Sequence, residues 1–333
     1  MNDLPAGVCD ALQTAVRRHI GQSAQIENIV VPTLGGINRT IVFDCVEGDS
    51  RRRLVSREET YESSMSPFLP PARQFQVMKL VHAHKFPVPE PIFMYDDTDE
   101  MGSGYVTAYV AGETMPKRIL ADAAYSRARD CFAIQAAKLL AHLHSLDVSE
   151  FAFLESEPDS VDPVAALRAR LDGYHEHHPA LEMGLRWLER HRPEPKSRVL
   201  VHGDFRVGNL MVDSEGVRAV LDWECSHIGT GIEDIGWLCA RSWRFGNIDR
   251  PVGGIAEREA FYEAYRNSGG AALDPEEVRY FEILGLVRWA VINVMQGYAH
   301  VHGGRKGIAF AAMGRNASLI EYELLMTLAG HYH

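Results

Sequence analysis

Residues 199–237 decide the fold, and they read VLVHGDFRVGNLMVDSEGVRAVLDWECSHIGTGIEDIGW. Two apolar runs within this segment, 199–201 and 217–221, each end in polar residues that chemistry could use. These polar residues are His202, Asp204, Asn209, Asp222 and Glu224.

The region between the two apolar runs predicts a hairpin. Residues 210–212 are typical of a short strand, and residues 213–216 of a turn. Such a hairpin would bring Asn209 and Asp222 back to the same end, although they lie thirteen positions apart. Carboxylates and an amide would then converge with a single imidazole. Hard oxygen ligands of this kind favour Mg²⁺ over zinc.

The spacing between Asp204 and Asn209 matches the catalytic loop of kinases, in which an Asp is followed by four residues and an Asn. In that arrangement Asp204 would accept the proton of an attacking hydroxyl, and Asn209 would bind Mg²⁺. Asp222 would link the metal to the β- and γ-phosphates. Phosphoryl transfer depends on positioning and charge neutralisation more than on covalent chemistry, so these few groups are sufficient.

The sequences HGDFRVGNLMV, LDWE and EDIGW strongly resemble the aminoglycoside phosphotransferase family of kinase-like small-molecule phosphotransferases. The resemblance implies that Asp204 is the catalytic base and that Asn209 and Asp222 are metal ligands. It also implies that His202 braces the loop and that Asp234 is a structural residue in the following helix. Glu224 has two open roles, either as a second metal contact or as a solvent-facing carboxylate.

The same resemblance implies a two-lobed α+β fold of the protein-kinase type, with the active site in the cleft. Residues 1–111 would form a small, β-rich nucleotide-binding lobe, and residues 112–333 a larger, mostly helical lobe for catalysis and acceptor binding. The sequence of the first lobe agrees with this. A helical pattern over 4–20 precedes five β-like runs broken by one helix. These runs are 26–31, 40–46, 53–57, 92–95 and 105–110.

The nucleotide is expected to meet three parts of this lobe. Gly35 and Gly36, between the first two runs, favour a loop that covers phosphates, although such a pair is often only a tight turn. Backbone groups of Ala108 and Val110 would hold adenine at the hinge. Val55 would pack on adenine. Side-chain alternation along its strand places Val55 and Arg57 on the same face.

Arg57 occupies the position where kinases carry the lysine that binds the phosphates of the nucleotide. Arginine keeps the charge and adds bidentate geometry. Gln74 occupies the position where a glutamate partner would align, so the partner of Arg57 is open. Other candidates for this partner are Glu58, Glu59 and Glu62.

Bulk composition limits the possible partners. The 333 residues carry a net charge of −11, which disfavours nucleic acid and anionic membrane surfaces. Five cysteines without metal-ligand spacing and no signal pattern at the start favour a cytoplasmic location.

The second lobe gives expectations about the acceptor. It resembles family members associated with acyl-CoA dehydrogenases, which implies a hydroxyl on a hydroxyacyl-CoA or another acid-bearing metabolite. Arg241 and Arg244 are expected on one helix, and Arg250 follows them. These arginines would form a solvated face or, alternatively, an anion-binding wall. Arg288, inside an apolar helix, should have a carboxylate partner. Residues 151–163 are expected to be a loop, and residues 174–179 a solvated helix end stopped by proline.

The predicted function is therefore Mg²⁺-dependent transfer of the γ-phosphate of ATP, or of GTP, to a small-molecule hydroxyl. Three alternatives stay open. The first is a kinase that modifies aminoglycosides, and the second is a nucleotide-binding module without catalysis, suggested by Gln74 and Arg57. The third is a metal-dependent phosphohydrolase.

Overall fold

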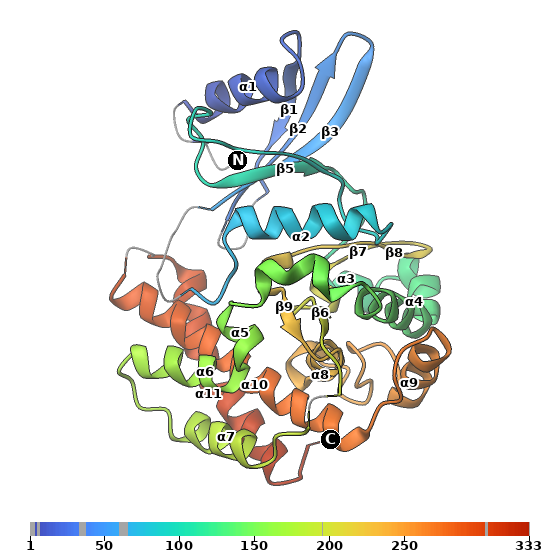
Figure 1. The fold of residues 1–333 in the computed structure, drawn as a ribbon, viewed down its shortest axis with the longest axis vertical. Helices are drawn as coiled ribbons and strands as arrows, with labels where there is room; N and C mark the ends of the chain where they lie inside the picture. Colours follow the sequence, from blue (N-terminus) through green and yellow to red (C-terminus); the bar gives the residue numbers. More distant parts are fainter. Residues whose placement is uncertain are drawn as a thin grey trace. The chain divides into compact units, whose positions relative to one another are not determined.

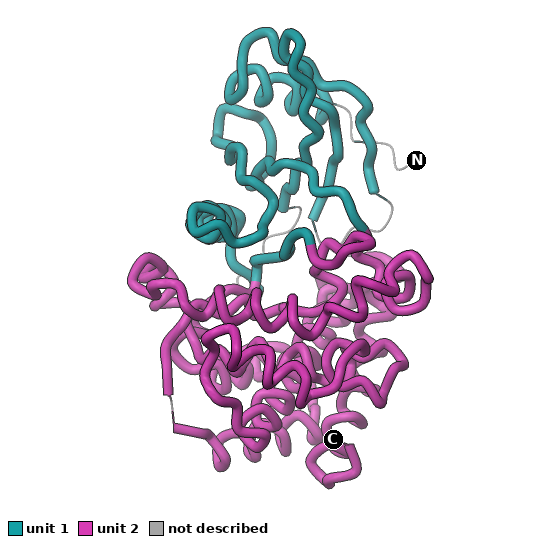
Figure 2. Tube along the Cα trace, turned by 90° about the vertical axis from the view of Figure 1, so that its right-hand side faces the viewer, with its two compact units in different colours: residues 1–112, 218–224 teal, residues 113–217, 225–333 magenta. Residues whose placement is uncertain are grey.

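The computed structural model describes residues 4, 7–32, 38–59, 66–194, 196–303 and 306–332. The chain divides into two compact units (Figure 2). Unit 1 contains Met1–Gly112 together with the later segment Arg218–Glu224, and unit 2 contains Glu113–Val217 and Cys225–His333. The segment that carries Asp222 and Glu224 therefore belongs to the unit formed by the start of the chain.

Unit 1 is built on a five-stranded antiparallel sheet with the order β1-β2-β3-β5-β4 (Figure 1). The predicted strands are all present, and so is the helix between the third and fourth of them. The elements are α1 (Val8–His19), β1 (Gln25–Val30), β2 (Arg39–Glu47), β3 (Ser50–Glu58), α2 (Pro71–Ala83), β4 (Pro91–Met94) and β5 (Gly104–Ala108).

Side-chain alternation explains the core of unit 1. On β2 and β3, Ile41, Phe43 and Leu54 are fully buried. Leu12 and Val16, one turn apart on α1, join the same cluster. Each such side chain contributes about 1.5–3 kcal/mol by leaving water. The opposite face of β3 carries the half-buried residues 55 and 57, as the pattern predicted.

Unit 2 is mostly helical, and the predicted α+β class is confirmed. Two short strand pairs form between residues 199 and 229, β6 with β9 and β7 with β8. The predicted hairpin at 210–221 is thus present. The strands are β6 (Val199–Val201), β7 (Leu210–Asp213), β8 (Gly216–Val220), whose residues 218–220 belong to unit 1, and β9 (His227–Gly229). The helices are α3 (Pro116–Ala121), α4 (Ser126–His144), α5 (Pro158–Val161), α6 (Pro163–Gly173), α7 (Pro179–Arg190), α8 (Ile232–Cys239), α9 (Arg258–Asn267), α10 (Pro275–Val301) and α11 (Ile308–Leu328).

Helix α10 is the apolar helix predicted near the end of the chain, and it packs against α6, α7, α8 and α11. Arg288 is buried in its middle. The Nη2 atom of Arg288 lies 3.4 Å from Asp159 Oδ1 and 3.9 Å from Glu233 Oε2, so the expected carboxylate partners exist.

Two expectations about unit 2 are wrong. Residues 151–163 are not one loop, because they contain part of a 3₁₀ segment, Val148–Leu154, and helix α5. Pro179 does not stop a helix but begins α7, where its missing N–H costs nothing. His178, just before it, bonds to Glu321 at 2.7 Å.

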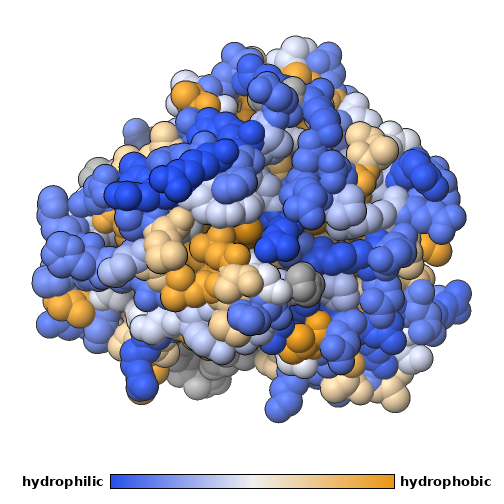
Figure 3. All heavy atoms as spheres, turned by 90° about the horizontal axis from the view of Figure 1, so that it is seen from below, coloured by the Kyte–Doolittle hydropathy of each residue, from blue (hydrophilic) through white to orange (hydrophobic). Residues whose placement is uncertain are grey.

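The surface is largely hydrophilic on the face drawn in Figure 3, with apolar residues in small groups. Exposed apolar side chains on unit 2 include Met183, Leu319 and Tyr322. Scattered residues of this kind are normal on a folded protein. Within the described residues, no helix has the length and hydropathy needed to cross a bilayer.

Candidate active site

A tight loop after β6 carries His202, Gly203 and Asp204. Gly203 has a φ of +80°, a left-handed conformation that glycine adopts at little cost. A Cβ atom on Gly203 would lie 2.2 Å from the carbonyl oxygen of Cys225. No side chain fits there without moving backbone. The glycine between the histidine and the aspartate is therefore required by the turn itself.

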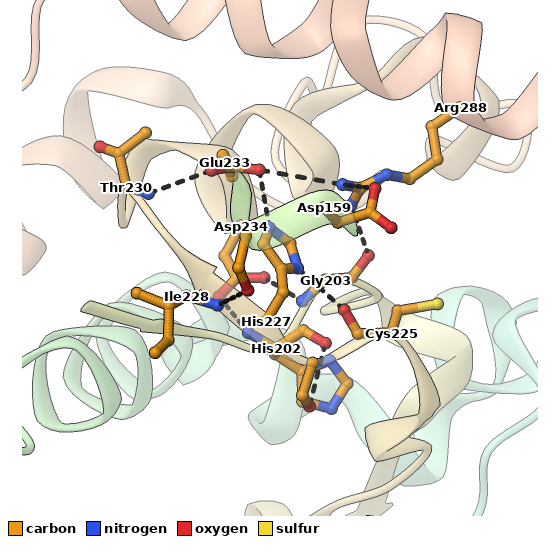
Figure 4. Close-up of polar contacts among 12 residues, drawn as sticks. Asp159, His202, Gly203, Cys225, His227, Ile228, Thr230, Glu233, Asp234 and Arg288 are labelled. Atoms are coloured by element: carbon orange, nitrogen blue, oxygen red, sulfur yellow. Dashed lines mark hydrogen bonds and ion pairs between the residues drawn. The ribbon is translucent and has the colours of Figure 1, made fainter. Parts of the chain in front are cut away.

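Asp234 holds this loop in place from helix α8 (Figure 4). Its carboxylate is fully buried and accepts the backbone N–H of His202 at 2.8 Å and that of Gly203 at 2.9 Å. A third contact comes from His144 Nε2 at 3.2 Å. Burial alone would raise the pKa of the Asp234 carboxyl, but the hydrogen bonds and the nearby imidazoles outweigh it and lower that pKa.

The ring of His202 supports the loop from within. It is fully buried, and its Nδ1 accepts the backbone N–H of Asp204 at 3.2 Å. The ring also packs edge-on against Phe205, with centroids 6.1 Å apart. His202 therefore fixes the backbone on both sides of Gly203, which is a bracing position.

The side chain of Asp204 is held by three donors. Its Oδ1 accepts Trp237 Nε1 at 2.8 Å and Arg206 Nε at 2.9 Å. Its Oδ2 accepts Asn209 Nδ2 at 2.5 Å. The Arg206 guanidinium lies over the ring of Trp243, 4.7 Å from the centroid. The carboxylate thus has one fixed orientation, with Asn209, the second predicted site residue, in contact.

The contacts of Trp237 and Arg206 with Asp204 were not predicted from the sequence. A signal for Trp237 was available, because it lies three positions after Asp234 and shares its helix face. The contact of Arg206 follows from the loop conformation, which the sequence does not specify.

In unit 1, Arg57 on β3 is the centre of a second polar cluster. Its guanidinium pairs with the carboxylates of Asp222 and Glu224, and the distance from Nη2 to Glu224 Oε2 is 2.9 Å. The amide oxygen of Asn38, in the orientation that satisfies it, accepts Nε and Nη2 at 3.0 Å. Burial alone would lower the pKa of Arg57, but the two carboxylates outweigh it and raise that pKa.

This cluster settles the open partner of Arg57. Gln74 does not bond to Arg57, since its amide donates to the Leu69 carbonyl at 2.7 Å and accepts the Tyr105 hydroxyl at 3.0 Å. Glu58 pairs with Arg39 instead, at 3.0 Å. Glu224 is neither solvent-facing nor a bystander, because it is mostly buried and bonded to Arg57. Glu62 lies outside the described residues.

Asp222 has an unusual backbone. Its φ is +65°, in the left-handed region that is sparsely populated for residues other than glycine. Asp and Asn tolerate this region best among the others. Retained backbone strain of this kind clusters at functional sites. The conformation follows strand β8 directly and turns the chain towards Glu224.

The other predicted nucleotide contacts have mixed outcomes. Val55 is half-buried and lies opposite Thr107 in the sheet. The N–H of Ala108 donates to the Glu90 carbonyl at 2.8 Å, so Ala108 can offer a ligand only its carbonyl oxygen. Val110 follows the end of β5. The predicted phosphate loop with Gly35 and Gly36 lies outside the described residues.

The proposed basic wall is not present as expected. Arg241 and Arg244 do not share a regular α-helix, because only a 3₁₀ turn, Arg241–Trp243, forms there. Arg244 is 3% exposed and donates to the carbonyls of Cys239 and Ile248. Burial lowers its pKa. Arg241 lies over the Tyr332 ring, and only Arg250, paired with Glu257 at 2.9 Å, fits a solvated face.

The loop at residues 202–209 and its brace have the arrangement expected of kinase-like phosphotransferases that act on small molecules. A sequence model described as the phosphotransferase enzyme family matches residues 41–279. The chain belongs to that family. The predicted fold and the predicted enzyme class, an ATP-dependent small-molecule kinase, are both confirmed at this level.

Known proteins agree with this assignment. A human protein, acyl-CoA dehydrogenase family member 11, is 31% identical over 49% of this chain and 22% of its own length. The chain thus spans about a fifth of that relative. The fold is similar to a Ralstonia eutropha protein assigned to the aminoglycoside phosphotransferases, with TM-score 0.69, 20% identity, and 96% and 97% of the two chains covered. It is also similar to a spectinomycin phosphotransferase in complex with ADP and spectinomycin (TM-score 0.62, 12% identity, 97% and 99% covered).

Replacing Asp234 tests the brace. Asp234→Asn removes a buried charge and one of the two acceptors of loop N–H groups, so the free energy of unfolding should fall by about 3 kcal/mol. Asp213→Asn is the matched control, because Asp213 also accepts two backbone N–H groups but in a partly exposed turn. Urea unfolding followed by circular dichroism measures both. An equal fall in the free energy of unfolding in the two variants would contradict the bracing role of Asp234.

A double-mutant cycle tests the partner of Arg57. Arg57→Met combined with Glu224→Gln should give a coupling energy of about 1–3 kcal/mol, since the two side chains are mostly buried and in contact. The control cycle pairs Arg57→Met with Gln74→Met and should give less than about 0.5 kcal/mol. Chemical unfolding supplies the energies. A larger coupling to Gln74 than to Glu224 would reverse the assignment.

Proposed function

We propose that the chain transfers the γ-phosphate of ATP, or of GTP, to a hydroxyl group of a small molecule, with Mg²⁺ present and Asp204 as the base. The observation that carries this proposal is the fixed Asp204 carboxylate, held by Trp237, Arg206 and Asn209 on a loop braced by Asp234. A base for phosphoryl transfer must be positioned before the reaction, since positioning supplies much of the rate.

Oδ1 of Asp204 already accepts two donors, whereas Oδ2 accepts only Asn209 Nδ2 and so keeps a lone pair that can meet the acceptor hydroxyl. Asp204 would orient the acceptor hydroxyl and take its proton as the oxygen attacks the γ-phosphorus. The donors Trp237 Nε1 and Arg206 Nε stabilise the ionised carboxylate that must be present before the reaction. His202 and Gly203 act on the backbone, so their contribution is to position Asp204.

The residues present fit a magnesium ion. The Nδ2 group of Asn209 donates to Asp204, so the amide oxygen of Asn209 points away from Asp204. Asp222 offers a carboxylate from a residue with a left-handed backbone conformation. Asn209 and Asp222 would hold the ion, and Glu224 would share its carboxylate between the ion and Arg57. Mg²⁺, when bound, neutralises charge on the transferring phosphate. Its donor set is hard oxygen, without thiolate.

Residues 1–111 would bind the nucleotide, and residues 112–333 would bind the acceptor. The half-buried Val55 and Arg57 share one face of β3, which supports packing on adenine and contact with phosphates. The carbonyl of Ala108 and the backbone of Val110 would meet the adenine edge. Gly35 and Gly36 keep their proposed role over the phosphates.

The proposed acceptor is a hydroxyacyl-CoA or another acid-bearing metabolite. Its support is the likeness of about half the chain to an acyl-CoA dehydrogenase family member. The arginines predicted to bind the acid group of the acceptor do not support this choice, because Arg244 donates to backbone carbonyls. An aminoglycoside is the alternative acceptor, and its support is the likeness in fold to a spectinomycin phosphotransferase.

A binding module without catalysis and a phosphohydrolase are less well supported. The first has no need of a carboxylate held by three donors, and the second would act on water rather than an alcohol. We also propose the cytoplasm as the location, since none of the five cysteines is joined in a disulfide, as suits a reducing compartment.

Asp204→Asn tests the base. This change keeps shape and most hydrogen bonds but removes the proton acceptor, so phosphoryl transfer should fall on the order of 10²–10⁴-fold. Calorimetry should show unchanged affinity for Mg²⁺-ATP. Asp213→Asn, a charge-matched change outside the site, should keep full activity. Full turnover by the Asp204 variant would exclude it as the base.

Asp222→Ala tests the metal assignment. Without this carboxylate, the affinity for ATP should no longer increase on adding Mg²⁺. Calorimetric titrations with and without the ion measure this, with Asp213→Ala from the same hairpin as the control. An unchanged effect of Mg²⁺ in the Asp222 variant would refute the assignment.

A further inference from the structure

Unit 2 contains a cavity of about 520 Å³. Its walls come from α5, the start of α6, residues 192–194 and 196–198, β9, and the first turns of α8 and α10. None of the residues proposed above for catalysis or metal binding lines it. Its size lies in the range of cavities that hold small organic ligands.

Part of the wall is apolar and buried. Val164, Ile228 and Phe281 line the cavity and are buried in the protein. Val161 lies at its exposed rim and is 72% exposed. A ligand that fills this space would therefore need an apolar body.

The charged part of the wall is acidic. Five carboxylates line the cavity against three cationic side chains. Two of these cations already have carboxylate partners. Arg192 makes two bonds to Asp162, both 2.9 Å long, and Lys196 lies 2.5 Å from Glu277 Oε1. This balance disfavours anions such as phosphates and favours a cation or a hydrogen-bond donor.

Glu277 supplies the most specific sign of a ligand. Its Oε2 atom is buried, and no donor in the described part of the chain reaches it. A buried acceptor without a donor costs about 1–3 kcal/mol, so such groups usually bind something. Lys196, on the other oxygen of Glu277, is 60% exposed, and an exposed ion pair of this kind is weak. A ligand with an ammonium group would satisfy Oε2.

The start of α8 carries both Glu233, which lines the cavity, and Asp234, which holds the loop; Figure 4 draws the polar contacts of both. Glu233 lines the cavity, and its Oε1 accepts the N–H of Thr230 at 3.0 Å while its Oε2 lies 3.0 Å from His227 Nε2. The next residue on the helix is Asp234, which holds the N–H groups of His202 and Gly203.

Arg288 makes a second connection. It lies 3.9 Å from Glu233 Oε2, and its Nη1 donates to the carbonyl of Gly203 at 3.5 Å. Asp159, which precedes the cavity residues of α5, pairs with the same guanidinium at 3.4 Å. The cavity wall and the loop therefore share one buried ion-pair network.

We propose that this cavity is an effector site for a small organic amine with an apolar body, and that its occupation stabilises the catalytic loop. The ammonium group bonds to Glu277, and the apolar body packs against Ile228 and Phe281. Filling the cavity restrains the start of α8, where Glu233 and Asp234 are adjacent, and so restrains the loop amides. The effect on turnover rests on the proposed function, but binding and loop order do not.

The probe is 2-phenylethylamine, with 2-phenylethanol as its neutral counterpart. Calorimetry on the full chain should show the amine binding about tenfold more tightly than the alcohol, as expected for a charge-assisted hydrogen bond. Glu277→Gln should weaken the amine about tenfold and leave the alcohol unchanged. Glu263→Gln, an exposed change on α9, is the matched control and should change neither.

Hydrogen exchange measures the second part of the proposal without any phosphoryl transfer. The saturating amine should slow exchange of the His202 and Gly203 amides at least severalfold, and it should not do so in Glu277→Gln. Val161→Trp fills the cavity from its exposed rim, so it should fold normally and lose amine binding.

Three results would overturn the proposal. They are no binding of the amine, equal binding of amine and alcohol, and binding that leaves loop exchange unchanged. Retained amine binding in Val161→Trp would place the ligand elsewhere. Since no phosphate is transferred in these experiments, their failure would leave the proposed function intact.

Discussion

A buried carboxylate that accepts two consecutive backbone N–H groups is the constraint on which the site depends. Asp234 is fully shielded from water, so its charge is tolerable only because several donors meet it. Those donors belong to the residues that set the turn at Gly203. The charge of one aspartate, on a helix thirty residues further along the chain, thus determines where Asp204 lies.

The geometry at Asp204 follows from this brace. A loop fixed at His202 and Gly203 can place the next side chain among Trp237, Arg206 and Asn209 without further adjustment. Because Trp237 comes from the same helix as Asp234, backbone and side chain of the loop are held by one rigid element. Such positioning is what phosphoryl transfer requires of a protein.

In unit 1 the Arg57 guanidinium is held in place although α2 carries Gln74 where a glutamate partner was expected. Arg57 pairs with two carboxylates that follow β8, and Gln74 is bonded to backbone and tyrosine instead. Arginine suits this position, because its planar fork can meet several oxygens at once. Asp222 and Glu224 are also proposed metal ligands, so their negative charge would stabilise both the Arg57 guanidinium and the ion.

The sequence predicted local features well and tertiary partners less well. The five strands of unit 1, the hairpin after Asn209 and the catalytic loop depend on short-range patterns and fixed spacing. The carboxylate partners of Arg288 followed from the high cost of an unpaired buried charge.

The partner of Arg57 was missed because it lies 167 positions away, and nothing local indicates it. Arg244 was misplaced because helical spacing was assumed for a segment that forms a 3₁₀ turn.

The most direct test of the central claim follows the γ-phosphate of labelled ATP with Mg²⁺ and a panel of alcohols. The panel contains a hydroxyacyl-CoA, choline, homoserine and an aminoglycoside, with a tube lacking acceptor. The account predicts that the label appears on the hydroxyl of one acceptor, and that free phosphate does not account for its loss from ATP. Release of free phosphate at the same rate in every tube, acceptor or none, would contradict the account.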